Sequence, residues 1–226
     1  MLYVIVEDKA LRNEYRIFDS RLSAGQRLKE FIKEKIDLIL AIPNGGVPVS
    51  EPLVEFLNPK EYNLLLIRKV HVPWTQEAGM GAITPDGTVF FNQQLIHSYN
   101  IEEKAIERKV NDALTAIEEK KKEYNLKDYE VKDKSVLITD DGIASGFSMI
   151  AGATWLKEKG AKFVIIAVPT GPIDSLNRIV ELVDKIICLN VRTRYPFAVA
   201  DAYKNWYDVP SQEVKQILKR IRSFFS

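Results

Sequence analysis

The stretch Val136–Met149 reads VLITDDGIASGFSM, and it decides how the rest of the chain is interpreted. Four residues typical of a buried strand are followed by two adjacent carboxylates, Asp140 and Asp141, and then by a loop of small residues that opens a helix. A helix N-terminus offers backbone N–H groups without intrahelical partners and the positive end of the helix dipole. The stretch therefore predicts an anion site, suited to a phosphate, at the end of a strand.

The loop after the two acids is built to let a ligand come close to the backbone. Gly142, Ala144 and Gly146 leave room for a phosphate, and Ser145 and Ser148 add hydroxyl donors. The two carboxylates would then face the neighbouring part of the ligand, where the vicinal hydroxyls of a ribose are suitable donors. Ribose 5-phosphate fits this arrangement. The alternative is that the acids are solvent-facing residues of a turn, one of them capping the helix, and these residues alone leave both interpretations open.

Apolar runs elsewhere in the chain predict five buried strands: Asp37–Pro43, Tyr62–Ile67, Ser135–Thr139, Phe163–Val168 and Lys185–Leu189. Runs rich in Val, Ile and Leu without polar alternation are typical of parallel strands covered on both faces. Because helical patterns lie between them, the sequence predicts an α/β fold with an open, mainly parallel five-stranded sheet flanked by helices. In such a sheet, ligands bind beyond the carboxyl ends of the strands.

The helical patterns and one interruption complete the predicted order. Residues 101–124 place apolar side chains at helical spacing among Glu and Lys, which indicates an amphipathic surface helix. A second helix follows the acidic pair and can end at Gly160. Between Arg68 and Asn92, Pro and Gly residues break the alternation, so we expect a mobile excursion that carries a hairpin. No linker divides the chain, and residues 1–226 are expected to form one domain.

Composition excludes several classes of function. The 32 basic and 31 acidic residues leave a net charge of +1, so no overall footprint for nucleic acid or an anionic membrane is expected. The single cysteine, Cys188, lies in an apolar run and predicts a buried strand residue, with no disulfide framework. Only two histidines, His71 and His97, are present, which disfavours a zinc site. The short apolar N-terminal run is unlike a signal peptide or membrane span, so a cytoplasmic location is expected.

The acidic motif resembles the 5-phosphoribosyl-1-pyrophosphate (PRPP) motif of type I phosphoribosyltransferases, and the resemblance extends over most of the chain. A subgroup of uncharacterised phosphoribosyltransferase-like proteins is similar at further places, in chain order: Phe18-Asp19-Ser20-Arg21 followed by Gly25, AIPNGGVPV (41–49), RKVHVP (68–73), EAGMGAI (77–83) and Tyr203 to Val214. The resemblance implies the type I fold, with a flexible-loop or hairpin excursion and a small hood region.

The resemblance also implies a role for each part of the site. Asp140 and Asp141 would hold the ribose 2′- and 3′-hydroxyls, and the backbone of Ala144 to Ser148 would hold the 5′-phosphate. The substrate-binding loop would comprise Gly142, Ile143, Ala144, Ser145, Gly146, Phe147 and Ser148.

Pyrophosphate would contact the loop after the first sheet strand, and cations from the next strand would stabilise its charge. That loop corresponds to Asn44, Gly45 and Gly46, and the cations to Arg68 and Lys69. His71 could donate a proton, although an exposed loop histidine is the simpler interpretation. The segment from His71 to Ala82 would close over the reacting centre, and aromatic residues after the last strand, Tyr195, Phe197, Tyr203 and Trp206, could stack on a base.

The predicted enzyme is therefore a phosphoribosyltransferase of nucleotide metabolism that uses Mg²⁺, which PRPP and water would hold without direct protein ligands. Its partners would be small molecules, with no nucleic acid and no membrane, and the resemblance implies a homodimer. Asn44 stands where the subgroup is expected to have arginine, His71 where it is expected to have glycine, and Ser145 replaces a usual threonine. Loss of the arginine affects turnover more than binding, so a non-catalytic PRPP or nucleotide sensor is the alternative.

Overall fold

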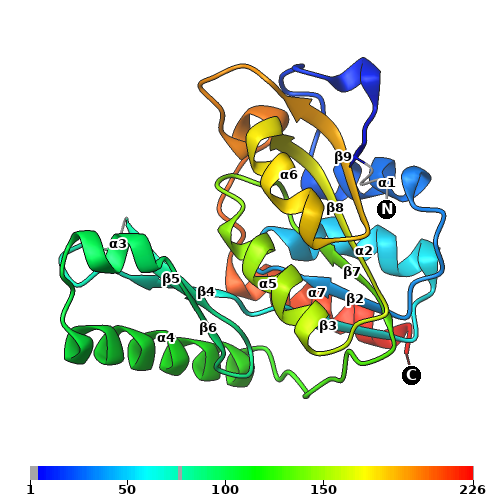
Figure 1. Cartoon of the computed structure of the whole chain (residues 1–226). Coiled ribbons are helices and arrows are strands. Elements are labelled where there is room, and N and C mark those ends of the chain that lie inside the picture. Colours follow the sequence, from blue (N-terminus) through cyan, green and yellow to red (C-terminus); the bar gives the residue numbers. More distant parts are fainter. Residues whose placement is uncertain (1–4, 76–77, 226) are drawn as a thin grey trace.

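A computed structural model describes residues 5–75 and 78–225, and its main element is a six-stranded parallel sheet with the order β1-β9-β8-β7-β2-β3 (Figure 1). Every pairing in this sheet is parallel. The strands are β1 (Ile5–Val6), β2 (Leu38–Ala41), β3 (Glu61–Leu64), β7 (Ser135–Thr139), β8 (Phe163–Pro172) and β9 (Lys185–Arg192). The predicted α/β class, with its open parallel sheet, is confirmed.

The sheet has one strand more than predicted. All five predicted runs form strands, and the sixth is β1, which pairs Ile5 with Ile186 and Val6 with Ile187 at the edge. A strand of two residues is shorter than the four to eight residues on which a periodic pattern can be recognised, so no usable signal for it exists in the sequence.

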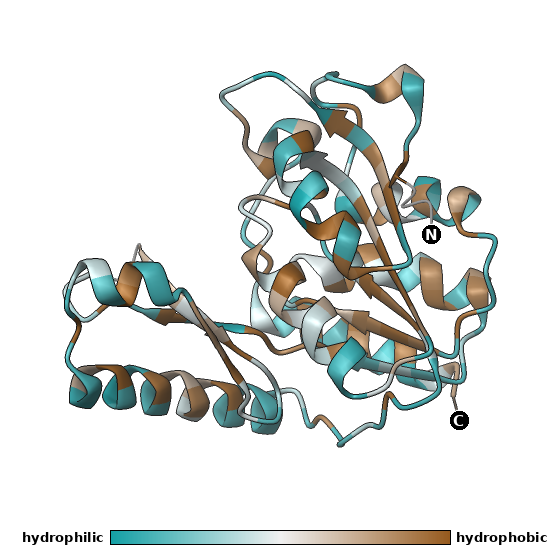
Figure 2. Ribbon diagram, viewed as in Figure 1, coloured by the Kyte–Doolittle hydropathy of each residue, from teal (hydrophilic) through white to brown (hydrophobic). Residues whose placement is uncertain are grey.

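Helices cover both faces of the sheet and bury its alternate side chains. One face packs against α1 (Arg21–Leu28), α2 (Gly46–Leu57) and α7 (Ser211–Ser223), and the other against α5 (Phe147–Glu158) and α6 (Ile173–Ile179). Short 3₁₀ turns complete the layers: Lys9–Leu11, Lys29–Phe31, Val180–Leu182 and Val199–Ala202. Figure 2 shows the hydrophobic strands enclosed between these layers, as the apolar runs predicted.

The chain changes direction across the sheet between β2 and β7. From β2 it runs through α2 to β3 at one edge, whereas from β7 it runs through α5 and α6 to β8 and β9 on the other side. The strands β2 and β7 are neighbours, and the connections that leave their carboxyl ends run to opposite sides of the sheet. A crevice at such a switch point is where ligands bind in open α/β sheets.

The excursion between β3 and β7 forms a projecting arm that contains more structure than the predicted hairpin (Figure 1). Three antiparallel strands, β4 (Arg68–His71), β5 (Gly79–Ile83) and β6 (Val89–Phe91), are followed by α3 (Gln93–Ser98) and α4 (Glu103–Glu123). The helix α4 is the predicted amphipathic helix of 101–124. Residues 76 and 77 of the predicted closing loop lie outside the described residues, and mobility of the arm, like the single-domain organisation, stays a prediction.

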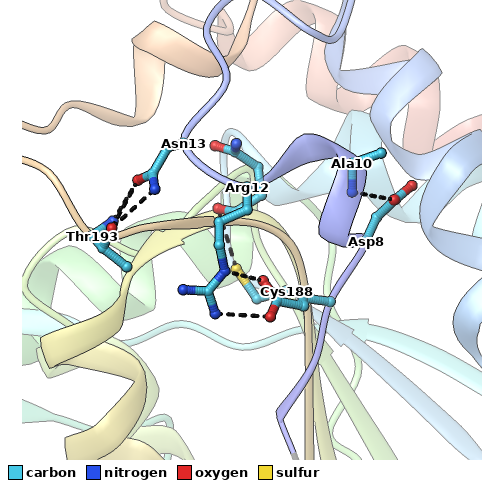
Figure 3. Close-up of polar contacts among 8 residues, drawn as sticks. Asp8, Ala10, Arg12, Asn13, Cys188 and Thr193 are labelled. Carbon is cyan, nitrogen blue, oxygen red and sulfur yellow. Dashed lines mark hydrogen bonds and ion pairs between the residues drawn. The ribbon is translucent and has the colours of Figure 1, made fainter.

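The N-terminal segment is fastened to the end of β9. Asn13 exchanges hydrogen bonds with Thr193, the Thr193 N–H donating to Asn13 Oδ1 at 2.8 Å (Figure 3). Arg12 also pairs with Glu7 at 2.8 Å. Cys188 is fully buried in β9 beside this segment, as predicted from its apolar run. In the described part of the chain, no helix is both long and apolar enough to cross a membrane.

Candidate active site

A cavity of about 570 Å³ opens where the connections after β2 and β7 diverge. One wall is the predicted phosphate loop at the start of α5, and another is the segment that follows β9. The lining residues are Arg21, Asn44, Gly45, Asp140, Asp141, Gly142, Ile143, Ala144, Ser145, Gly146, Phe147, Ser148, Met149, Val199, Trp206, Asp208 and Val209. The structure thus brings together the acidic pair, the entire predicted substrate loop and part of the predicted pyrophosphate loop.

The phosphate loop is held in shape from behind by α6. Ser175 Oγ donates to the carbonyl of Ala144 at 2.7 Å, and Arg178 Nη2 donates to the carbonyl of Ser145 at 2.9 Å. Gly146 precedes α5 with φ +80°, a conformation that L side chains rarely adopt, and Ser148 in the first helical turn is exposed. Because its carbonyls are engaged on the α6 side, the loop is fixed as an open cradle at a helix N-terminus.

The two acids after β7 have different surroundings. Asp140 Oδ1 accepts the backbone N–H of Asp141 at 2.8 Å. Burial raises the pKa of Asp140 well above its ordinary value, and the neighbouring charge of Asp141 raises it further, whereas Arg21 acts in the opposite direction. Asp140 is thus an acid whose protonation state responds to what binds beside it.

Asp141 is held by an ion pair that sequence analysis did not predict. Arg21, in the first turn of α1, donates from Nε to Asp141 Oδ2 at 2.8 Å, and its side chain is only 5% exposed against 14% for Asp141. The Arg21 guanidinium also donates to the carbonyl of Tyr207 at 2.9 Å and lies 4.0 Å from the ring centroid of Trp206. Tyr203 donates its hydroxyl to the carbonyl of Asp141 at 2.6 Å. Asp141 is therefore held in a fixed orientation by Arg21 on its carboxylate and by Tyr203 on its carbonyl.

The glycines after β2 allow their loop to lie directly against the acidic pair. A Cβ added at Gly45 would be 2.0 Å from Asp141 Oδ2, and one added at Gly46 would be 2.8 Å from the Thr139 carbonyl and 2.9 Å from the Asp140 Cα. Any side chain here would have to displace the acids or the strand that carries them. The two predicted loops are thus parts of one site.

Asn44 is engaged within the protein on both sides of its amide. Its Nδ2 donates to the carbonyl of Val209 at 2.8 Å, and its Oδ1 accepts the hydroxyl of Tyr124 at 2.9 Å. The side chain therefore links the loop after β2 to α4 and to the segment before α7. It supplies no positive charge where the resemblance led us to expect arginine.

The three predicted basic residues lie in β4, at the base of the arm. Arg68 lines a smaller cavity of about 60 Å³ together with Asn44, whereas Lys69 and His71 line neither this cavity nor the larger one. Burial, followed by the charge of Lys69, lowers the pKa of His71. His71 is therefore mainly neutral near pH 7 in this conformation. Of these three residues, Arg68 adjoins the predicted pyrophosphate loop, and the other two would need the arm to move.

Among the four aromatic residues after β9, only Trp206 lines the cavity. Tyr203 is 2% exposed and packs in the core, Tyr195 donates its hydroxyl to Asp174, and Phe197 lies against the guanidinium of Arg192. The predicted hood region stays a prediction.

No group of three or more His, Cys, Asp or Glu side chains is arranged to hold a metal within residues 5–75 and 78–225. At the cavity, Asp141 Oδ2 is already paired with Arg21, so the acids leave few oxygens for a direct metal ligand set. This donor set fits a Mg²⁺ ion that is carried mainly by ligand phosphates and water.

Several lining residues were missed, and one of them had a signal. Arg21 belongs to the FDSR stretch quoted for the resemblance, but nothing in the sequence connects it with Asp141, 120 residues away. Asp208 and Val209 come from irregular backbone, and Val199 begins the short 3₁₀ turn after β9. Ser175 and Arg178 do not line the cavity and act through loop carbonyls. Such contacts depend on tertiary placement and have no local pattern.

A parallel α/β sheet with a carboxylate pair and a small-residue loop at its switch point is typical of proteins that bind nucleotides or sugar phosphates. The phosphoribosyl transferase domain model matches residues 10–202. The chain therefore belongs to the phosphoribosyl transferase family.

Individual relatives agree with this assignment. Two Mycobacterium tuberculosis proteins, from strains CDC 1551 / Oshkosh and H37Rv and each described as "Putative phosphoribosyl transferase", are 28% identical over 216 residues. The match covers 93% of this chain but 48% of each relative, so the chain spans about half their length. The crystal structure of TT1426 from Thermus thermophilus is similar with a TM-score of 0.74 and 25% identity, over 90% of this chain and 98% of that one.

Proposed function

We propose that the protein transfers a 5-phosphoribosyl group from magnesium-bound PRPP to a nitrogenous base and releases pyrophosphate. The observation that carries the proposal is the single cavity in which the acidic pair, the loop at the start of α5 and the glycines after β2 meet. Each part matches one portion of PRPP: a diol, a terminal phosphate and a pyrophosphate.

The proposed binding mode follows from the free donors and acceptors of these parts. The 5′-phosphate would accept N–H groups of Ala144–Ser148 at the N-terminus of α5. The ribose hydroxyls would donate to the carboxylates of Asp140 and Asp141, and Arg21 would hold Asp141 in place through its Oδ2. Pyrophosphate would then lie toward Asn44–Gly46 and Arg68.

The transfer breaks the bond from C1′ to the pyrophosphate oxygen, and the bonding electrons leave with pyrophosphate. A nitrogen lone pair of the base forms the new bond to C1′, and the base loses its proton. Positive charge develops at C1′ while negative charge grows on the leaving group, so cations at Arg68 would stabilise the transition state. Water would attack the same centre, and closure of the arm would exclude it.

Magnesium, when bound with PRPP, would neutralise charge on the pyrophosphate oxygens. The protein would contribute mainly by orienting the sugar. A raised pKa of Asp140 suits a group that is charged only when hydroxyl donors or nearby cations are present.

A second candidate function is a sensor that binds PRPP or a nucleotide without turnover. The observation in its favour is Asn44, whose amide is committed to Tyr124 and Val209 and adds no charge to the leaving-group side. Pyrophosphate release, measured with Mg²⁺ and PRPP against a panel of purines, pyrimidines and nucleoside monophosphates, separates the two. Steady release with any acceptor supports the transferase. Saturable binding without release supports the sensor, and absence of binding refutes both.

A further inference from the structure

The small cavity beside the loop after β2 brings a second cation, in addition to Arg68, next to the proposed pyrophosphate position. It encloses about 60 Å³ and is lined by Pro43, Asn44, Leu66, Ile67, Arg68, Ile117 and Lys120. Lys120 comes from the last turn of α4, more than 50 residues beyond Arg68 in the sequence. The side chains of Arg68 and Lys120 therefore both line this cavity, together with Asn44.

Lys120 is connected to the loop after β2 through hydrogen bonds. Its Nζ donates to the hydroxyl of Tyr124 at 3.3 Å and to Ser211 Oγ at 3.2 Å, and that same Tyr124 hydroxyl donates to Asn44 Oδ1 at 2.9 Å. The ammonium also lies 4.9 Å from the centroid of the Tyr124 ring. The end of α4 is thus held against the loop, and the hydroxyl of Tyr124 connects the Lys120 ammonium to the amide of Asn44.

The charge at this position is not cancelled by its acidic neighbour. Glu123 pairs with Lys120 at 2.7 Å and with Lys215 at 3.4 Å, so two ammonium groups share one carboxylate. Burial alone would lower the pKa of Lys120, but the hydrogen bonds to Glu123 and Tyr124 outweigh it, and the pKa is raised. The cluster therefore carries one net positive charge at neutral pH.

This charge lies where the proposed ligand needs it. Pyrophosphate carries several negative charges, and the loop Asn44–Gly46 itself contains no cation. The long, flexible stem of lysine lets its ammonium move while remaining partly buried. A phosphate oxygen entering the small cavity would thus compete with Glu123 for Lys120.

We propose that Lys120, together with Arg68, binds the pyrophosphate group of PRPP and supplies the positive charge that Asn44 does not. The inference rests on the proposed function, because it takes the pyrophosphate position from that binding mode. With this role for Lys120, the last turn of α4 would form part of the substrate site.

The two ends of PRPP provide a test that separates this inference from the proposed function. Ribose 5-phosphate reports on the acidic pair and the loop at α5, whereas PRPP also reports on the pyrophosphate position. Isothermal titration with each ligand in the presence of Mg²⁺ would compare wild type with Lys120→Met, Lys120→Arg and Glu123→Gln. Lys122→Met is the matched control, since Lys122 is an exposed lysine on the same turn of α4.

Lys120→Met should weaken PRPP binding about tenfold or more, as expected for one lost charge-assisted hydrogen bond, with ribose 5-phosphate binding unchanged. Lys120→Arg should retain most of the affinity. Glu123→Gln should tighten PRPP binding, a gain that a purely structural role of Lys120 would not produce.

Equal PRPP affinities in wild type and Lys120→Met, or an equal loss for both ligands, would overturn the role of Lys120 while the proposed function stands. If wild type binds neither ligand, the proposed function fails and the inference fails with it.

Discussion

Replacement of Arg21 by methionine tests whether the acidic pair is held in place from α1. Methionine keeps the unbranched stem and removes the guanidinium, leaving the largely buried carboxylate of Asp141 without its partner. Removing one partner of a buried ion pair costs about 3–5 kcal/mol, and loss of the stacking on Trp206 at 4.0 Å adds about 1 kcal/mol. Arg21→Met should therefore lower the free energy of unfolding by about 4–6 kcal/mol.

A double-mutant cycle isolates the pair itself. Urea unfolding would be followed by tryptophan fluorescence for wild type, Arg21→Met, Asp141→Asn and the double variant. Because the double variant leaves neither charge buried alone, it should be more stable than the sum of the single losses by about 1–3 kcal/mol.

Arg27→Met is the control, because Arg27 lies on the same helix and makes ion pairs with Asp8 at 2.8 Å and Glu30 at 2.6 Å while 47% exposed. Exposed pairs contribute about 0–1 kcal/mol each, so this variant should change stability little. If Arg21→Met costs no more than Arg27→Met, or the coupling energy is below about 0.5 kcal/mol, the reasoning about Asp141 is refuted.

Three further predictions concern the rest of the site. The pKa of Asp140 is raised in the folded state. Between the ordinary pKa of about 3.9 and the raised pKa, the folded state therefore binds more protons than the unfolded state. The contribution of Asp140 to the free energy of unfolding thus falls as pH rises through this window. Asp140→Asn should therefore gain melting temperature relative to wild type as pH increases, and a pH-independent difference would contradict the assignment. Gly146→Val places a β-branched residue at φ +80°, a backbone strain that costs about 1–3 kcal/mol of stability. This variant should no longer bind 5′-monophosphates. Equal affinity of wild type for a nucleoside and for its 5′-monophosphate would argue against the predicted phosphate site. Amide hydrogen exchange in the described residues of His71–Ala82 should slow when Mg²⁺ and PRPP bind, with Val136–Ser148 as the binding control; protection in the control alone would exclude a closing arm and favour the sensor.

The parts of the fold that could be predicted are those with a local physical signature. Continuous apolar runs identified β2, β3, β7, β8 and β9, and the periodicity of 101–124 identified α4. Glycines and a carboxylate pair at a strand end indicated the loop that lines the cavity. Each of these signals comes from residues that are adjacent in sequence and share one environment.

The parts that could not be predicted depend on distant residues meeting. Arg21 pairs with Asp141, 120 residues away, and Tyr124 contacts Asn44, 80 residues away. Lys120 reaches the cavity beside Asn44 and Arg68 because packing sets the direction of α4. The arm was expected as a hairpin because Pro and Gly mark turns, and β5 and β6 form one. The pairing of β4 with β5 and the way α4 returns to the sheet have no local signature.

Binding of ribose 5-phosphate to the site formed by Asp140 and the loop at α5 is the central claim, and one titration tests it most directly. Isothermal titration would compare wild type with Asp140→Asn, which keeps the ion pair of Arg21 with Asp141 and should remain folded, and with Asp128→Asn, an exposed aspartate away from the cavity. Wild type and Asp128→Asn should bind equally, and Asp140→Asn should lose about 1–3 kcal/mol of binding free energy, because a charge-assisted hydrogen bond to the ribose is lost. Unchanged affinity in a folded Asp140→Asn variant, or no binding of ribose 5-phosphate by wild type, would contradict the account.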